Sequence, residues 1–134
     1  MVGIAPFRLA KGGVALAKWQ LKSYLYCVNR ILVMYVTTAG KKVFQDWLDS
    51  LDESTSARVA ARLDRIEQGN FGDCKPAREG VYELRLDFGP GYRVYFGIVS
   101  GQVVLLTCGG TKKTQTKDIE SAIEYLKEYK KRHI

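Results

Sequence analysis

Two arginines and a tyrosine stand at alternate positions of two segments that flank the Gly-Pro-Gly turn at 89–91. Arg85 precedes this turn, and Arg93 and Tyr95 follow it. Arginine makes fixed bidentate contacts with phosphate. A tyrosine can stack on a base or donate a proton. The pattern therefore indicates a surface that binds a phosphate-containing ligand.

Further basic residues surround these segments, so that residues 75–113 hold six basic and three acidic side chains. RNA cleavage by attack of a 2′-hydroxyl on the neighbouring phosphate needs a base, a proton donor and cations around the charged transition state. The basic residues would supply the cations, and the four outside the two segments are Lys75, Arg78, Lys112 and Lys113. The simpler interpretation is a solvated side of a sheet, with Asp87 and Arg93 as a surface ion pair.

A predicted β-hairpin positions these side chains. Apolar and polar residues alternate over 82–88 and again over 92–98, on either side of the glycine-rich turn. If Phe88 pairs with Tyr92, the apolar residues form one face that helices cover, with Tyr82 and Tyr92 in the core. The opposite face is then exposed, and it pairs Asp87 with Arg93 and Arg85 with Tyr95.

The remaining patterns predict the elements around this hairpin. Residues 31–36 are typical of a strand buried on both faces. Apolar residues recur at helical spacing over 43–51 and 59–66, which predicts an antiparallel pair of helices. A strand is expected over 103–108, and then a helix that buries Ile119, Ile123 and Leu126. The order β-α-α-β-β-β-α indicates an α+β fold with an antiparallel sheet, a two-helix hairpin and a C-terminal helix.

Length, charge and composition indicate what class of protein this chain belongs to. A length of 134 residues suggests one compact domain, and no apolar run is long enough for a membrane helix. The helical pair carries seven acids against three arginines between residues 44 and 73, so we expect it to form the acidic side. The chain has a single histidine, His133, and three cysteines without CxxC spacing, Cys27, Cys74 and Cys108. These residues predict neither disulfides nor a metal or cofactor site, and they favour a cytoplasmic location.

Residues 1–33 differ from the rest of the chain. They hold five basic residues and no acid, whereas residues 34–134 hold 16 basic and 14 acidic residues. The segment could be a docked helix, a targeting segment, or sequence translated ahead of the true start. We favour the last, because Met34 begins a natural first strand, and we take 34–134 as the domain. Deletion of residues 1–33 is then expected to leave a folded, active protein.

Three sequence motifs resemble the RelE/ParE superfamily of toxins. GVYELR at 80–85, GPGYRVYF at 89–96 and LLTCGG at 105–110 followed by two lysines are similar to the sheet signatures of RelE/HigB-type toxins. FxxWLxxL at 44–51 and RIEQGNFGD at 65–73 resemble the phage-related branch described as addiction module killer proteins. The resemblance covers about residues 34–132.

The resemblance implies a toxin that cuts messenger RNA, commonly within the ribosome, and that a co-expressed antitoxin neutralises. Arg93 matches the phosphate-binding arginine, Arg85 a basic residue of the preceding strand, and Lys112 and Lys113 the basic pair after the last strand. We expect Arg93→Ala to abolish growth arrest while the protein stays folded, because Arg93 is predicted on the exposed face of the hairpin.

The sequence also departs from the RelE pattern. Glu83 stands where RelE has a lysine, and Ile119 stands where RelE has a catalytic tyrosine, for which Tyr95 could substitute. Two other functions remain open: a ParE-like toxin that inhibits DNA gyrase without cutting RNA, and an inactive nucleic-acid-binding remnant.

Overall fold

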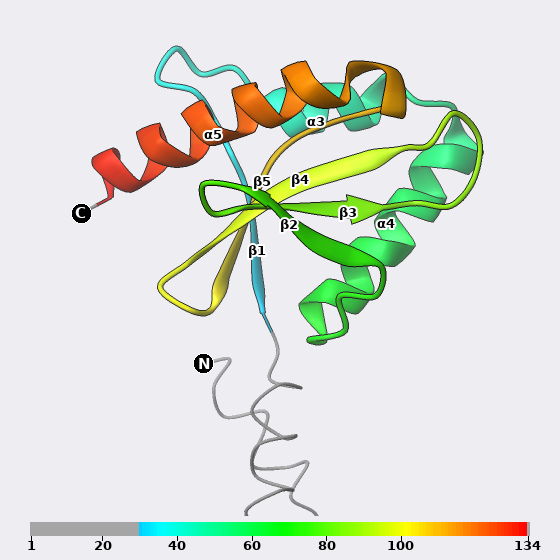
Figure 1. Ribbon diagram of the computed structural model, residues 1–134, viewed down its shortest axis with the longest axis horizontal. Helices are drawn as coiled ribbons and strands as arrows, with labels where there is room; N and C mark the ends of the chain where they lie inside the picture. Colours follow the sequence, from blue (N-terminus) through cyan, green and yellow to red (C-terminus); the bar gives the residue numbers. More distant parts are fainter. Residues whose placement is uncertain (1–29, 134) are drawn as a thin grey trace, which may run out of the picture.

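The computed structural model describes residues 30–133 (Figure 1). Its elements are, in chain order, β1 (Ile31–Met34), α3 (Val43–Asp49), α4 (Glu53–Glu67), β2 (Cys74–Arg78), β3 (Val81–Arg85), β4 (Arg93–Val99), β5 (Val103–Gly110), the 3-10 helix η2 (Lys112–Thr114) and α5 (Gln115–Arg132). The α+β class and the order of the predicted elements are confirmed. One strand, β2, was not predicted, because its polar residues and Pro76 are unusual for a strand except at a sheet edge.

The five strands form one sheet in the order β1-β5-β4-β3-β2. β1 pairs in parallel with β5, and the other neighbours are antiparallel. β1 is therefore an edge strand, and Ile31 and Met34 are more than a third exposed. The prediction that this strand is buried on both faces is wrong, since burial depends on a strand's place in the sheet as well as on its composition.

The apolar face of the predicted hairpin forms the larger core. Leu84 of β3 and Phe96 of β4 are buried there, together with Phe44 of α3 and Val59 and Ile66 of α4. Tyr82 and Tyr92 pack against the same cluster and are partly buried. The predicted core face of the hairpin and the predicted inner face of α4 are thus confirmed.

The opposite face of the sheet is not an open surface as predicted, because α5 covers much of it. Ile123 and Leu126 of α5 are buried as expected, and they form a second core with Tyr95 of β4. Close packing is possible because Gly97 has no side chain: a Cβ there would lie 2.6 Å from Leu126 Cδ1. The sheet consequently lies between α4 and α5 (Figure 1). Within residues 30–133, no helix is long and apolar enough to cross a membrane.

The pairing of β3 with β4 differs from the predicted register by two residues. Arg85 lies opposite Arg93, and Glu83 lies opposite Tyr95. The predicted register was wrong because the connection is longer than the Gly-Pro-Gly turn: β3 ends at Arg85 and β4 begins at Arg93. A shift of two residues keeps each side chain on its predicted face. It also makes Arg85 and Arg93 direct cross-strand neighbours.

The predicted boundary at residue 34 falls inside β1. Ile31, Leu32 and Val33 pair with β5, and the backbone N–H of Arg30 donates to the carbonyl of Glu67 at 2.7 Å. A protein that begins at Met34 would lack three of the four β1 residues. The expectation that it folds unimpaired therefore conflicts with the strand pairing. Residues 1–29 lie outside the described residues, so the three explanations for them stay predictions.

Cys108 makes stability sensitive to alkaline pH. Burial raises the pKa of its thiol from 9.0 to about 12. In the unfolded chain this thiol ionises near pH 9, whereas in the folded chain it stays protonated until about pH 12. Ionisation therefore favours the unfolded chain, and the free energy of unfolding falls as the pH rises from 9 towards 12. One such group costs about 1.4 kcal/mol per pH unit. We expect urea denaturation to show about 1–2 kcal/mol less loss between about pH 8.5 and 10.5 in Cys108→Ala than in the parent. The same loss in both proteins would contradict this role of Cys108.

Candidate phosphate-binding site

A hollow of about 240 Å³ lies at the end of the sheet where β3 stops, β4 starts and β5 leads into η2. We call it the sheet-end hollow. Three of the predicted site residues, Arg85, Arg93 and Lys112, line it together. They come from β3, β4 and η2, which converge there because β4 pairs with both β3 and β5. The structure thus brings together the central part of the predicted cationic cluster.

Arg93 lies at the base of this hollow and is held by two contacts. Its Nη1 donates to the carbonyl of Gly91 at 2.8 Å, and its Nε lies 3.1 Å from Glu83 Oε2 without forming an aligned hydrogen bond. The side chain is only 9% exposed. The expectation of a freely exposed Arg93 is therefore wrong, and so is the reason given for Arg93→Ala remaining folded. Among residues 30–133, Nη2 makes no hydrogen bond, and the Arg93 side chain lines the hollow.

Glu83 is the centre of a buried polar network behind Arg93. Its side chain is 1% exposed. Gln115 Nε2 of α5 donates to its Oε2 at 2.6 Å, and the Tyr95 hydroxyl donates to the same oxygen at 3.2 Å. Lys75 Nζ lies 3.9 Å from its Oε1. A buried carboxylate needs such partners, and this one anchors the arginine that lines the hollow.

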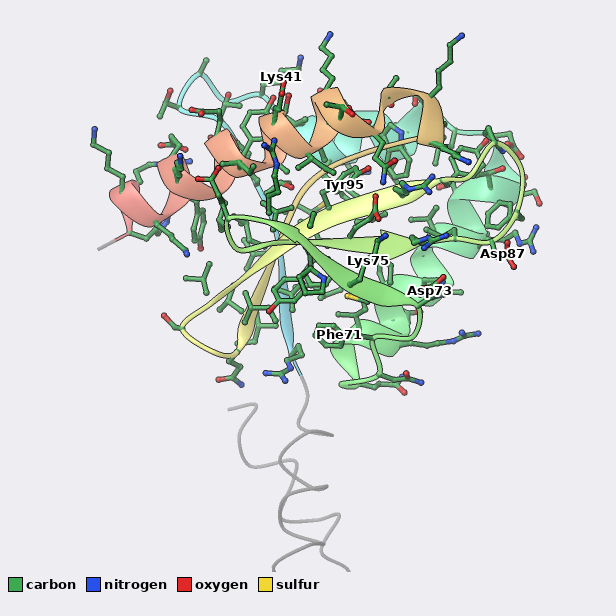
Figure 2. All side chains as sticks on the ribbon, viewed as in Figure 1. Lys41, Phe71, Asp73, Lys75, Asp87 and Tyr95 are labelled. Atoms are coloured by element: carbon green, nitrogen blue, oxygen red, sulfur yellow. The ribbon has the colours of Figure 1, made fainter. Side chains whose placement is uncertain are left out.

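Tyr95 does not lie on an open face. It is completely buried between the sheet and α5 (Figure 2). Burial and the neighbouring negative charge of Glu83 raise the pKa of its phenol well above its ordinary value. The expectation that it stacks on a base is wrong for this structure, since the ring does not line the sheet-end hollow. The hydroxyl helps to position Glu83.

The other predicted basic residues lie at different distances from the hollow. Lys75 on β2 is 55% exposed, and it contacts Glu83, which in turn pairs with Arg93 in the hollow. Lys113 is exposed beside Lys112 in η2. Arg78 pairs with Val81, at the end of the β2–β3 hairpin away from Arg85. The cluster therefore consists of Arg85, Arg93 and Lys112, with Lys75 and Lys113 at its margin.

Gly91 allows the loop to lie directly against these cations. Its φ is +80°, and a Cβ would stand 3.0 Å from Arg93 Nη1 and 3.3 Å from Lys112 Cβ. A side chain there would be strained and would occupy the space beside both basic groups. This is the physical reason for a glycine just before the Tyr-Arg pair.

Sequence reasoning missed the polar groups that share the hollow with the cations. Asp73, Asp87 and Tyr92 also line it, and Figure 2 shows Asp73 before β2 and Asp87 in the β3–β4 loop. The sequence predicts Tyr92 in the core, and in the structure it both packs on the core and lines the hollow. Carboxylates can accept a proton and a phenol can donate one. The β3–β4 loop brings these groups together, and the alternation of residues along a strand cannot predict the path of a loop.

Among the described residues, no group of three or more histidine, cysteine, aspartate or glutamate side chains is placed to hold a metal ion. The free thiols of Cys74 and Cys108 are partly and largely buried, respectively. The sheet-end hollow is lined by cations that can bind an anion, and by carboxylates and a phenol that can transfer protons.

Comparison with known proteins places this chain beside sequence relatives. The sequence profile of a family described as "Phage derived protein Gp49-like (DUF891)" matches residues 46–130. A protein of Haemophilus influenzae, named only as an uncharacterized protein, is 48% identical over 80 residues, which cover 59% of this chain and 81% of that relative. Both the hollow and the buried network around Glu83 lie within the span that the profile matches.

Proposed function

Because this chain belongs to the Gp49-like family of phage-derived proteins, we propose that it is the toxin of a toxin–antitoxin pair and that it cleaves messenger RNA. The observation that supports cleavage most directly is the meeting of Arg85, Arg93 and Lys112 in one hollow. Three cations at one site can bind a phosphodiester and stabilise the additional charge of its transition state.

The proposed reaction is an internal transfer at one phosphate. The 2′-hydroxyl loses its proton and attacks the adjacent phosphorus, and the bond to the 5′-oxygen of the next nucleotide breaks. The leaving oxygen gains a proton, so the products are a 2′,3′-cyclic phosphate and a 5′-hydroxyl end. Arg93 and Arg85 hold the phosphate in this scheme. In this scheme Asp73 or Asp87 accepts the proton and Tyr92 donates one, which is supported by their lining the same hollow as the cations.

The two departures from the RelE pattern have structural roles in this proposal. Glu83 replaces a lysine of RelE, and here it pairs with Arg93 instead of facing the ligand. Ile119, at the position of the RelE tyrosine, packs on the core between the sheet and α5. Proton transfer would therefore depend on the loop and hollow residues rather than on α5.

The proposed partners follow from this function. A cognate antitoxin would neutralise the protein by covering the sheet-end hollow, and messenger RNA would enter it, in association with the ribosome. An antitoxin segment that binds there should contain acidic residues opposite Arg85 and Lys112, since those two side chains are exposed.

Induction of the protein in cells, followed by mapping of transcript 5′ ends, tests the proposed activity. We expect growth arrest and new transcript ends that carry a 5′-hydroxyl, which a ligase joins only after phosphorylation. A protein with Arg132→Lys, at the far end of α5, serves as the matched control and should give the same ends. Intact transcripts together with arrested gyrase would reject cleavage and favour the ParE-like function. Harmless induction would favour an inactive remnant.

A further inference from the structure

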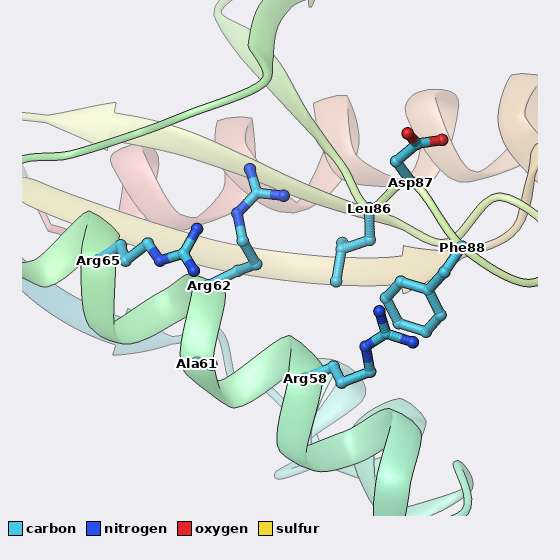
Figure 3. Close-up of a pocket in the computed structure, with 7 residues that line it drawn as sticks. All are labelled: Arg58, Ala61, Arg62, Arg65, Leu86, Asp87 and Phe88. Atoms are coloured by element: carbon cyan, nitrogen blue, oxygen red, sulfur yellow. The ribbon is translucent and has the colours of Figure 1, made fainter.

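Three arginines of α4 line a second hollow, of about 370 Å³, between that helix and residues 86–88 (Figure 3). We call it the α4 hollow. Arg58, Arg62 and Arg65 are spaced by four and three residues, so they lie on one side of the helix. The prediction that the helical pair forms the acidic side is wrong for this surface, because all three arginines of that segment line it.

Two of these arginines are already oriented by the protein. The guanidinium of Arg58 lies 3.8 Å from the centre of the Phe88 ring. Arg62 donates to the carbonyl of Arg85 at 2.8 Å and to that of Phe71 at 3.3 Å. Such contacts restrict the side chains and lower the entropic cost of binding an anion.

No acid neutralises this surface among the described residues. The four ion pairs found in residues 30–133 include none of the three α4 arginines. Asp87 lines the α4 hollow, but its carboxylate points away from the guanidinium groups (Figure 3). The α4 hollow therefore carries positive charge that no ion pair among the described residues balances.

The α4 hollow adjoins the sheet-end hollow. Leu86, Asp87 and Phe88 line both hollows. Phe88 is partly exposed, with Arg58 over its ring and the Tyr92 ring 5.4 Å away. Aromatic rings beside arginines are typical of sites where unpaired bases stack while cations bind the backbone.

We propose that the α4 hollow binds phosphates of the same RNA strand next to the phosphate that is cleaved, with a base stacked on the exposed guanidinium of Arg58, which itself lies over the Phe88 ring. The strand then runs from Arg93 across Phe88 to Arg58 and Arg65. This inference rests on the proposed function, since it assigns the neighbouring part of the substrate. An acidic protein segment is the competing ligand. RNA is favoured because Phe88, with the Arg58 guanidinium over its ring, lines both cationic hollows, which suits a strand whose bases and phosphates alternate.

Salt-dependent binding of RNA tests this assignment. The probe is a short labelled single-stranded RNA with 2′-O-methyl riboses, which lacks the attacking hydroxyl and cannot be cleaved. The test protein is the full chain with Arg58→Gln and Arg65→Gln, and Arg62 is kept because it binds two carbonyls. The control carries Lys130→Gln and Lys131→Gln, which remove the same charge from the exposed end of α5.

We expect the arginine variant to bind the probe at least about tenfold more weakly than the control, with a slope of log K against log salt that is smaller by about 1.4, or 0.7 for each lost phosphate contact. Equal affinity and slope in the two variants would overturn the inference. Unchanged RNA binding with weakened antitoxin binding would also overturn it, in favour of the protein ligand.

The two proposals fail in different ways. If the parent cuts transcripts in cells but the arginine variant binds RNA like the control, only the role of the α4 hollow is refuted. If RNA binding depends on Arg58 and Arg65 while transcripts stay intact, cleavage is refuted and the binding site stands.

Discussion

Replacement of Arg93 by lysine is expected to lower RNA cleavage by about 10²–10³-fold while the protein stays folded. Lysine keeps a positive charge near Glu83, so the buried carboxylate retains a counter-charge. It loses the planar fork that bonds to the Gly91 carbonyl through Nη1 and leaves Nη2 for the phosphate. The loss would therefore fall on the charged transition state more than on the fold.

Cleavage rates on ribosome-bound and free transcripts, measured beside urea denaturation, check this result. Arg132→Lys is again the control, because it makes the same chemical change on α5 outside both hollows. Arg93→Ala is a poorer test, since it leaves Glu83 buried without its nearest cation. If Arg93→Lys cleaves RNA and arrests growth like the parent, Arg93 does not bind the reacting phosphate.

The largest effect on stability is expected for Glu83→Ala, at about 3–5 kcal/mol of the free energy of unfolding. The change leaves the buried guanidinium of Arg93 without a counter-ion. It also removes the acceptor for Tyr95 and Gln115. Unpaired buried polar groups cost far more than exposed ones.

Urea denaturation of Glu83→Ala and Glu79→Ala measures this difference. Glu79 pairs with Lys127 at 3.3 Å, but both side chains are more than half exposed, so its loss should cost less than about 1 kcal/mol. Glu83→Gln keeps an oxygen for Tyr95 and should lie between the two. Similar values for Glu83→Ala and Glu79→Ala would mean that the Glu83 network contributes little to folding.

The Glu83 network also connects stability with the site. It joins β3, β4 and α5 directly behind the arginine that lines the sheet-end hollow. A variant that loosens α5 at Gln115 would therefore be expected to disturb Arg93 without touching the ligand. Gly91 lies beside both the Arg93 guanidinium and Lys112, so a side chain at this position would crowd both of them.

Local patterns in the chain were sufficient for most of the elements and their faces, with β2 and the exposure of β1 as the exceptions. The alternation on both sides of the turn at 89–91 assigned Leu84 and Phe96 to the core, and the helical spacing assigned Val59 and Ile66 to it. These assignments succeed because a strand or helix repeats its environment with a fixed period. The same alternation kept Arg85 and Arg93 on one face, even though the predicted register was off by two residues.

Only the tertiary structure decided what lies against those faces. The burial of Glu83 and Tyr95 depends on α5, which docks closely because Gly97 has no side chain to obstruct Leu126. The meeting of Arg62 with the carbonyl of Arg85 joins residues 23 apart in the chain. A periodic pattern distinguishes one side of an element from the other, but the element's partner is set by contacts between segments distant in sequence, and no local pattern contains them.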